Sequence, residues 1–281
     1  MLFPENIGEH LSIDEVSLSK GELYTFVTNK RGKGKHGTLV ASVKGTRSSD
    51  IVKTLERLPL TDRKQVKEVT LDMAKNIELA TKTAFPETIL VTDRFHVVKL
   101  AMEALQHLRV KYRWQELDKE NKAIEQAKKE GVKYKPLQFS NGDTPKQLLA
   151  RSRYIIAKKP NQWTENQTQR AKLLFKIYPA IEIAYKHTLE FRSIYEITDK
   201  LIAKEHFEKW ILNTFENKLE TFYTTANTVK SNLDNILNFF INRNTNANAE
   251  SFNAKIKLFR ANLRGVTDTT FFLFRLYKLF A

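Results

Sequence analysis

Cysteine is absent from this 281-residue chain, and glycine and proline are scarce, with nine and seven residues. Without thiols the chain cannot form disulfides, thiolate zinc sites, iron–sulfur clusters or a cysteine nucleophile. A metal site would have to be built from carboxylates and the six histidines, which suits a hard cation.

Long apolar runs are also missing. No uncharged apolar stretch approaches the ~18 residues needed to span a bilayer. The start of the chain, Met1 to Asn6, has neither the basic nor the apolar region of a secretory signal. We therefore expect a cytoplasmic protein without a membrane partner.

Acidic residues are too few to balance the basic ones. The chain has 47 Lys and Arg against 32 Asp and Glu, a formal net charge of +15. Residues 1–101 are nearly neutral, with 16 basic and 13 acidic residues, whereas residues 102–281 have 31 and 19. Clustered cations release counterions when they meet phosphates, so the excess favours a polyanionic partner such as DNA.

The hydrophobic period changes along the chain. Short β-rich runs and amphipathic stretches follow one another over the first hundred residues and predict the order β-β-β-α-β-α-β. The expected strands are 10–18, 22–27, 38–43, 66–71 and 88–92, and the expected helices are 48–58 and 76–85. Helical patterns follow for about 150 residues, and Thr164 with Gln167 forms a capping-box start there. We predict an α/β protein with a mixed sheet in residues 1–101, an all-helical insertion in 102–241 and a last core helix with a tail in 242–281.

The last core helix has two chemically distinct faces. Spacings of 3, 4, 3 and 4 put one carboxylate, one amide and three cations on one face: Glu250, Asn253, Lys257, Arg260 and Arg264. The opposite face is apolar and should pack on the core: Phe252, Ile256, Phe259 and Leu263. Glu250 near the helix start is either a favourable cap or a metal ligand.

Two acids fall in or at the end of expected strands. Asp14 interrupts the first strand, and Asp72 ends the fourth. A buried acid is costly unless it is paired or binds a metal. Each acid alone is more simply a turn or capping residue. The three together, in a β-β-β-α-β order with a late helix that bears Glu250, favour a site that holds two Mg²⁺ ions for phosphodiester chemistry.

Several sequence strings resemble the catalytic region of bacterial insertion-sequence transposases of the ISL-three family: Ser12-Ile13-Asp14-Glu15, Thr70-Leu71-Asp72-Met73, Thr92-Asp93-Arg94-Phe95-His96 and Asn246-Ala247-Asn248-Ala249-Glu250-Ser251-Phe252-Asn253-Ala254-Lys255-Ile256-Lys257. This resemblance implies a ribonuclease-H-like fold with a DDE metal triad, interrupted by a helical insertion before the helix with the Glu. It further implies DNA cleavage and strand transfer at transposon ends and target, two Mg²⁺ ions that Mn²⁺ can replace, and a homo-oligomer on DNA in the nucleoid.

Asp72 and Asp93 compete for the middle position of the triad. The resemblance places the second Asp after the fourth strand, which selects Asp72. Asp93 and His96 then match the C/D-x-x-H motif that some transposase groups have downstream of it. His96 could orient Asp93 or approach the scissile phosphate, or it could be a helix-start histidine bonded to Asp93. Lys257, Arg260, Arg264 and Asn253 are expected to contact DNA.

Family members usually have an N-terminal zinc-binding and helix-turn-helix region that recognises the element's ends. This chain opens thirteen residues before Asp14 and has no cysteine. We therefore expect recognition to come from a separate protein or to be lost.

A basic glycine-rich loop, Arg31 to Gly37, permits two interpretations: a phosphate-binding loop or an ordinary hairpin loop. At the level of function, the main hypothesis is a DDE transposase. The alternatives are an inactive DNA-binding remnant or accessory protein of a mobile element, and a structure-specific nuclease or resolvase on the same fold.

Overall fold

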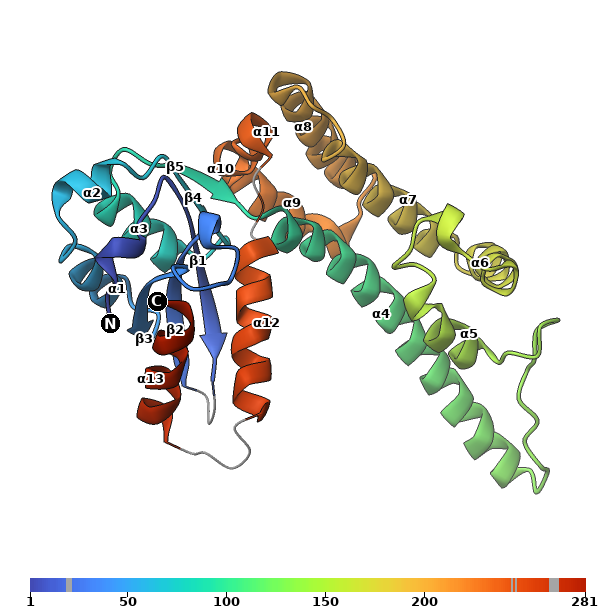
Figure 1. Cartoon of the computed structure of the whole chain (residues 1–281). Helices are drawn as coiled ribbons and strands as arrows, with labels where there is room; N and C mark the ends of the chain where they lie inside the picture. The colour runs from blue at the N-terminus through green and yellow to red at the C-terminus, as the bar shows by residue number, and fades with distance from the viewer. Residues whose placement is uncertain (19–21, 244, 246, 263–267) are drawn as a thin grey trace. The chain divides into compact units, whose positions relative to one another are not determined.

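The computed structural model describes residues 1–18, 22–243, 245, 247–262 and 268–281, and for 247–250 it describes the helical backbone alone. The chain divides into two compact units (Figure 1). The first contains residues 1–97 and 232–281, and the second contains residues 98–231. Each unit is described by itself below.

The first unit is built on a five-stranded mixed sheet with the order β3-β2-β1-β4-β5. Its strands are β1 (His10–Ser17), β2 (Leu23–Asn29), β3 (Leu39–Lys44), β4 (Glu68–Leu71) and β5 (Ile89–Thr92). β1, β2 and β3 form an antiparallel meander, whereas β4 pairs in parallel with both β1 and β5. All residues of β4 and all of β5 except Ile89 are buried, as expected for parallel strands that are covered on both faces.

Helices cover both faces of this sheet (Figure 1). One face packs against α1 (Ser48–Leu55) and α3 (Lys75–Ala84), with the short α2 (Leu60–Lys64) between them in sequence. The other packs against α12 (Ala247–Asn262) and α13 (Thr269–Phe280). The short helices α10 (Leu233–Leu237) and α11 (Phe239–Asn242) also belong to this unit, and α10 contacts β5.

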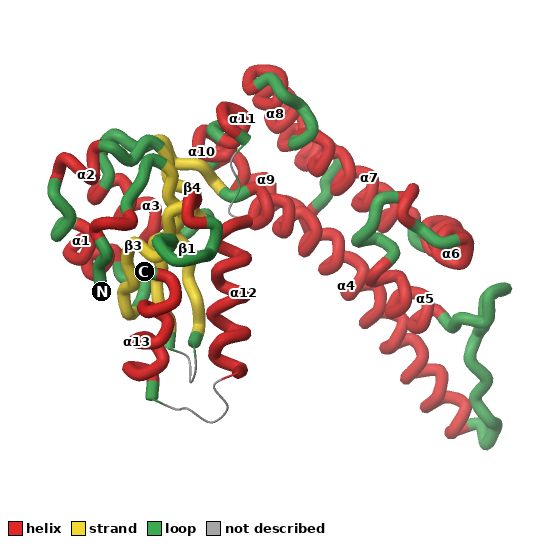
Figure 2. The backbone as a smooth tube through the Cα atoms, viewed as in Figure 1, coloured by secondary structure: helices red, strands yellow, loops and turns green. Residues whose placement is uncertain are grey.

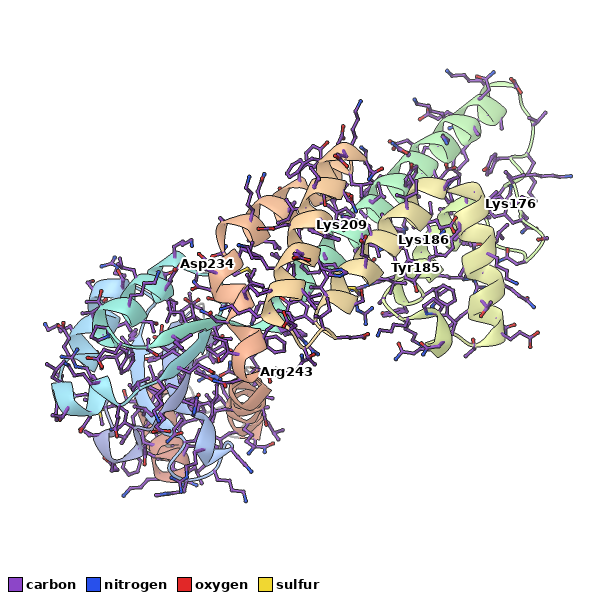
Figure 3. The ribbon with its side chains drawn as sticks, turned by 90° about the horizontal axis from the view of Figure 1, so that it is seen from above. Lys176, Tyr185, Lys186, Lys209, Asp234 and Arg243 are labelled. Carbon is purple, nitrogen blue, oxygen red and sulfur yellow. The ribbon has the colours of Figure 1, made fainter. Side chains whose placement is uncertain are left out.

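The second unit, all of whose residues the structure describes, consists of helices and loops (Figure 2). Its helices are the long α4 (Arg94–Lys129), which begins in the first unit, and α5 (Pro145–Arg151), α6 (Glu165–Ile177), α7 (Pro179–Ile194), α8 (Lys200–Glu216) and α9 (Tyr223–Ser231). Exposed lysines lie on successive helices, among them Lys176, Lys186 and Lys209 (Figure 3).

Aromatic packing and one buried acid hold the second unit together. Trp210 is fully buried and stacks on His187 with ring centroids 4.4 Å apart, and burial lowers the pKa of His187 to about 4. Asp143 is also fully buried and forms ion pairs with Arg151 and Arg170. Burial by itself would raise the pKa of Asp143, but the two guanidinium groups outweigh it and lower that pKa.

The predicted elements agree with the structure in type and order, and the capping box at Thr164 is confirmed. The helix expected over 48–58 ends at Leu55, and the following residues form tighter turns in which the Leu58 N–H donates to the Leu55 carbonyl. Leu58 itself precedes Pro59, and a residue before proline is disfavoured in the helical conformation. Leu58 is nevertheless buried, as its spacing predicted. Within the described residues, no helix combines the length and apolar character needed to cross a bilayer.

We expect Asp143→Asn to reduce the free energy of unfolding of the second unit by about 1.5–3 kcal/mol at pH 7, because a hydrogen bond to a charged group contributes about that much. The folded pKa of Asp143 lies below its unfolded value, so its contribution is present above the unfolded pKa and is lost as pH falls through the folded pKa. The loss caused by the substitution should therefore shrink below pH 4.

Urea denaturation followed by tryptophan fluorescence measures this effect, because Trp114, Trp163 and Trp210 all lie in the second unit. Asp118→Asn, at an exposed position on α4, is the matched control. Equal losses from the two substitutions would contradict a special role for the buried carboxylate.

Candidate functional site

Three aspartates occupy equivalent positions in, or directly after, three neighbouring strands. Ser12 of β1 lies opposite Thr70 of β4, and continuing this parallel register brings Asp14 level with Asp72. The parallel register of β4 with β5 likewise brings Asp93 beside Asp72. Side chains at equivalent positions of parallel strands point to the same face of the sheet. We call Asp14, Asp72 and Asp93 the aspartate row.

Strands β4 and β5 end just before this row. Asp72 and Asp93 are the first residues after β4 and β5, and the Asp93 N–H donates to the Leu71 carbonyl at 2.9 Å, which extends the ladder by one step. Asp14 lies inside β1, which continues to Ser17. The face on which the row lies is the one that α12 and α13 cover.

The acids of the row interact electrostatically. Burial raises the pKa of Asp14, and the negative charges of Asp72 and Asp93 raise it further. The Glu15 backbone N–H, which donates to Asp14 Oδ1 at 2.8 Å, and the nearby His96 act in the opposite direction. A half-buried carboxylate facing two others is a place where a cation would be stabilised.

Asn253 of α12 connects the last core helix to the row. Its Nδ2 donates to Asp14 Oδ2 at 2.6 Å, while the neighbouring turn of the helix is anchored by Phe252, which is buried against Phe26. The predicted apolar face of α12 is confirmed at Phe252 and Ile256, which are fully buried. Asn253, which we expected to contact DNA, bonds to an acid of the row within the chain.

Asp93 and His96 lie at the start of α4. Asp93 is 1% exposed, and its Oδ2 lies 3.8 Å from His96 Nε2. The spacing of three residues places both side chains on the same side of the first turn. His96 can therefore orient Asp93, and its ring also meets Phe95 edge to face.

A buried polar network adjoins the row on the same face. Lys30 Nζ donates to Glu68 Oε1 at 3.0 Å and also bonds to the Thr70 hydroxyl, and Asn242 Nδ2 donates to Glu68 Oε2 at 3.2 Å. Burial lowers the pKa of Lys30, while the charges of Glu68 and Asp93 act against that change.

Sequence reasoning missed this network. The signal was present, because Glu68 is an acid on an expected strand, as Asp14 is, and a buried acid requires a partner. The partner Lys30 follows β2 and could not be identified from spacing, since the two residues meet only across the sheet.

Not every expected site residue can be placed. Arg264 lies outside the described residues, and for Glu250 only the helical backbone is described. Among the side chains that the structure describes, no three acids or histidines are close enough together to form a metal site by themselves. Lys257 is exposed on α12, and Arg260 is half-buried with its guanidinium 5.2 Å from the Phe272 ring centroid.

Comparison with known proteins gives one match. A protein-family model described as Transposase, of the DDE type and the ISL3 group, matches residues 11–276. The matched range includes the whole aspartate row, His96 and Glu250. No curated protein and no solved structure matched the chain.

We expect Asp14→Asn to stabilise the metal-free protein at pH 7 by about 0.5–2 kcal/mol, the size of a typical single stabilising substitution. The folded pKa of Asp14 is raised, so the folded state prefers the protonated acid and its stability falls as pH rises through the unfolded and then the folded pKa. The amide removes that penalty.

Thermal unfolding in EDTA at pH 7, and again below pH 3.5 where the gain should vanish, measures this. Asp50→Asn, at an exposed position on α1 in the same unit, is the control. If Asp14→Asn unfolds at a lower temperature than the unmodified protein at pH 7, the repulsion among the carboxylates of the row is already compensated in the absence of metal.

Proposed function

This chain belongs to the ISL3 family of transposases, and we propose that it is the catalytic subunit that cleaves and transfers DNA strands of an insertion sequence. In this proposal water and then a DNA 3′-hydroxyl attack phosphodiesters in line. The observation that carries the proposal is the aspartate row, in which Asp14, Asp72 and Asp93 are brought level by the parallel register of three strands.

The row has the chemistry of a divalent-metal site. Its side chains offer oxygen atoms, which Mg²⁺ and Mn²⁺ prefer. The pKa of Asp14 is raised mainly by burial and to a smaller extent by the negative charges of Asp72 and Asp93, and a bound cation would offset both effects. Asp14, Asp72 and Glu250 would hold the metals. Two such ions, when bound, activate the attacking oxygen and stabilise the leaving oxygen.

The choice of Asp72 over Asp93 as the middle carboxylate is supported by exposure. Asp72, directly after β4, is half-buried, as Asp14 is, whereas Asp93 is almost fully buried. A metal ligand must bind an ion that also contacts DNA, so its carboxylate has to be accessible from the protein surface. In our proposal Asp93 therefore does not bind a metal but supports Asp72 from the neighbouring position in the row, and His96 orients Asp93.

Asn253 and the cations of α12 have separate roles in this proposal. Asn253 fixes the orientation of the Asp14 carboxylate through its 2.6 Å hydrogen bond. Lys257 and Arg260, one and two turns further along α12, hold DNA phosphates, which contributes affinity and position without sequence information. Arg264 would extend this surface.

We further propose that the sheet is ribonuclease-H-like. Its strand order, with an antiparallel meander followed by two parallel strands, supports this assignment. We also propose the division into 1–101, 102–241 and 242–281, a homo-oligomeric assembly on DNA, and a separate protein that recognises the transposon ends.

We expect Asp72→Asn to abolish strand cleavage at any Mg²⁺ concentration, because asparagine keeps the size of aspartate but loses the charge that holds a divalent ion. Asp93→Asn should retain measurable cleavage, reduced ~10–100-fold, as is typical when a residue that supports the metal ligands without binding the metal is changed. Cleavage of a pre-paired transposon end, with the recognition protein added if required, measures both.

Asp118→Asn controls for the substitution itself, and DNA binding in EDTA controls for lost affinity. Residual cleavage in Asp72→Asn beside an inactive Asp93→Asn would move the middle carboxylate to Asp93. Cleavage that survives every substitution in the row would refute the proposed site, and cleavage without strand transfer would favour a nuclease or resolvase.

We expect Lys257→Ala to weaken binding to all DNA sequences alike and to reduce the slope of log K against log salt by roughly one, as loss of one phosphate contact does. Lys53→Ala, at an exposed position on α1 over the opposite face of the sheet, should leave the slope unchanged. Equal slopes for Lys257→Ala and the unmodified protein would assign this helix face to protein contacts or solvent.

A further inference from the structure

Three arginines without an acidic partner lie close together in the second unit. Arg109 and Arg113 are one helical turn apart on α4, so their side chains leave the same side of the helix. Arg153 lies in the single 3₁₀ turn Ser152–Tyr154, which directly follows α5. α5 lies beside α4 (Figure 1), and Arg109 Nη1 donates to the Leu149 carbonyl of α5 at 2.9 Å. We call Arg109, Arg113 and Arg153 the arginine cluster.

Hydrogen bonds hold two members of the cluster in place. Gln106, one turn before Arg109 on α4, connects them, because its Oε1 accepts from Arg109 Nε at 2.7 Å and its Nε2 donates to the Arg153 carbonyl at 2.9 Å. The Arg153 guanidinium lies 5.5 Å from the Tyr154 ring centroid. The cluster is therefore assembled in the free protein, and groups ordered before binding lose less entropy when a ligand arrives.

No acid balances the charge of the cluster. Within the second unit, all of whose residues the structure describes, none of the three guanidinium groups forms an ion pair with a carboxylate. The nearest acids along α4 pair with lysines instead: Glu103 Oε1 lies 3.7 Å from Lys99 Nζ, and Glu116 Oε1 lies 2.8 Å from Lys119 Nζ. Asp143, before α5, is occupied by its own two arginines.

The three guanidinium groups repel one another. Burial lowers the pKa of Arg109, which is 7% exposed, and the charges of Arg153 and Arg113 lower it further. Arginine stays protonated in proteins, so the loss of a proton cannot relieve this repulsion. The arrangement costs stability in the free protein, and a bound anion would offset that cost.

Two members of the cluster have donors left for a ligand. Arg109 uses its Nε and Nη1 within the chain, as described above. The Arg153 side chain is exposed, and in the described chain its guanidinium donates no hydrogen bond. Arg113 is half-buried, and its Nε is buried without a hydrogen-bond partner among the described residues. Guanidinium groups bind phosphate oxygens in a bidentate manner, so a phosphate suits these open donors.

We propose that Arg113 and Arg153 bind a phosphate of the DNA backbone, with Arg109 adding positive charge, so that the second unit has a DNA contact of its own. The inference rests on the proposed function for the identity of the ligand. The composition of the unit supports a polyanion, because residues 98–231 contain 25 Lys and Arg against 16 Asp and Glu. The contact is independent of DNA sequence, and it shares no residue with the aspartate row or with the cations of α12.

The test is fluorescence anisotropy of a labelled duplex oligonucleotide over a KCl series in EDTA, where no cleavage occurs. The double variant Arg113→Ala/Arg153→Ala loses one phosphate contact, so the slope of log K against log salt should fall by roughly one. Arg153→Lys keeps the charge but not the bidentate geometry, so it should keep the slope and lower the affinity.

The matched control is the double variant Lys186→Ala/Lys204→Ala. It removes two exposed cations of the same unit, and Lys186 is labelled in Figure 3. Both lysines already have an acidic partner, Glu182 at 2.7 Å and Glu208 at 3.8 Å. The salt slope of this control should equal that of the unmodified protein.

An arginine double variant that unfolds at the temperature of the unmodified protein and binds with an unchanged slope would overturn the inference. If that variant unfolds early, the exposed Arg153 decides: unchanged affinity in both Arg153→Ala and Arg153→Lys would also overturn it. Cleavage assays separate this result from the main proposal. An inactive Asp72→Asn with an unchanged slope in the arginine variants refutes only the arginine cluster as a DNA contact, whereas a reduced slope with an active Asp72→Asn refutes only the catalytic assignment.

Discussion

Parallel strands that run side by side end at the same edge of a sheet, and this constraint brings together acids from three distant parts of the sequence. Asp72 and Asp93 each follow a strand of four residues, so neither can move along the ladder without moving the other. Asp14 joins them because β1 lies next to β4. A slip of one residue in any of these pairings would turn an acid to the opposite face.

Two apolar clusters fix that register. Leu11, Ile13, Val69 and Leu71 face α1 and α3, whereas Val16, Tyr24 and Phe26 face α12 and α13. Each strand is buried on both sides, and this apolar packing stabilises the sheet enough to hold mutually repelling carboxylates near the carboxyl ends of β4 and β5. The local cost is visible in the raised pKa of Asp14, and the burial of apolar side chains around it offsets that cost.

Polar contacts connect the aspartate row and the neighbouring Glu68 to segments from elsewhere in the chain. Asn253 bonds to Asp14 from α12, and Asn242 bonds to Glu68 from the end of α11. Lys30 reaches the same acid from the loop after β2. The segments on either side of residues 243–246 are therefore both fastened to the sheet. This arrangement suits a helix that must present Glu250 to the aspartate row in the proposed reaction.

The sequence by itself determined the type and order of the elements, because hydrophobic period, prolines and caps act over a few residues. The strands, the helix that ends before Pro86 and the buried stripe of Phe252 and Ile256 were all predictable in this way. Asp14 and Asp72 could be singled out as acids in or after apolar strands. Only the tertiary structure decided that Asp93 joins their row, that Asn253 bonds to Asp14, and that Lys30 pairs with Glu68. These contacts depend on which strands are neighbours and in what register, and that is set by packing between segments far apart in the chain, where no local pattern carries information.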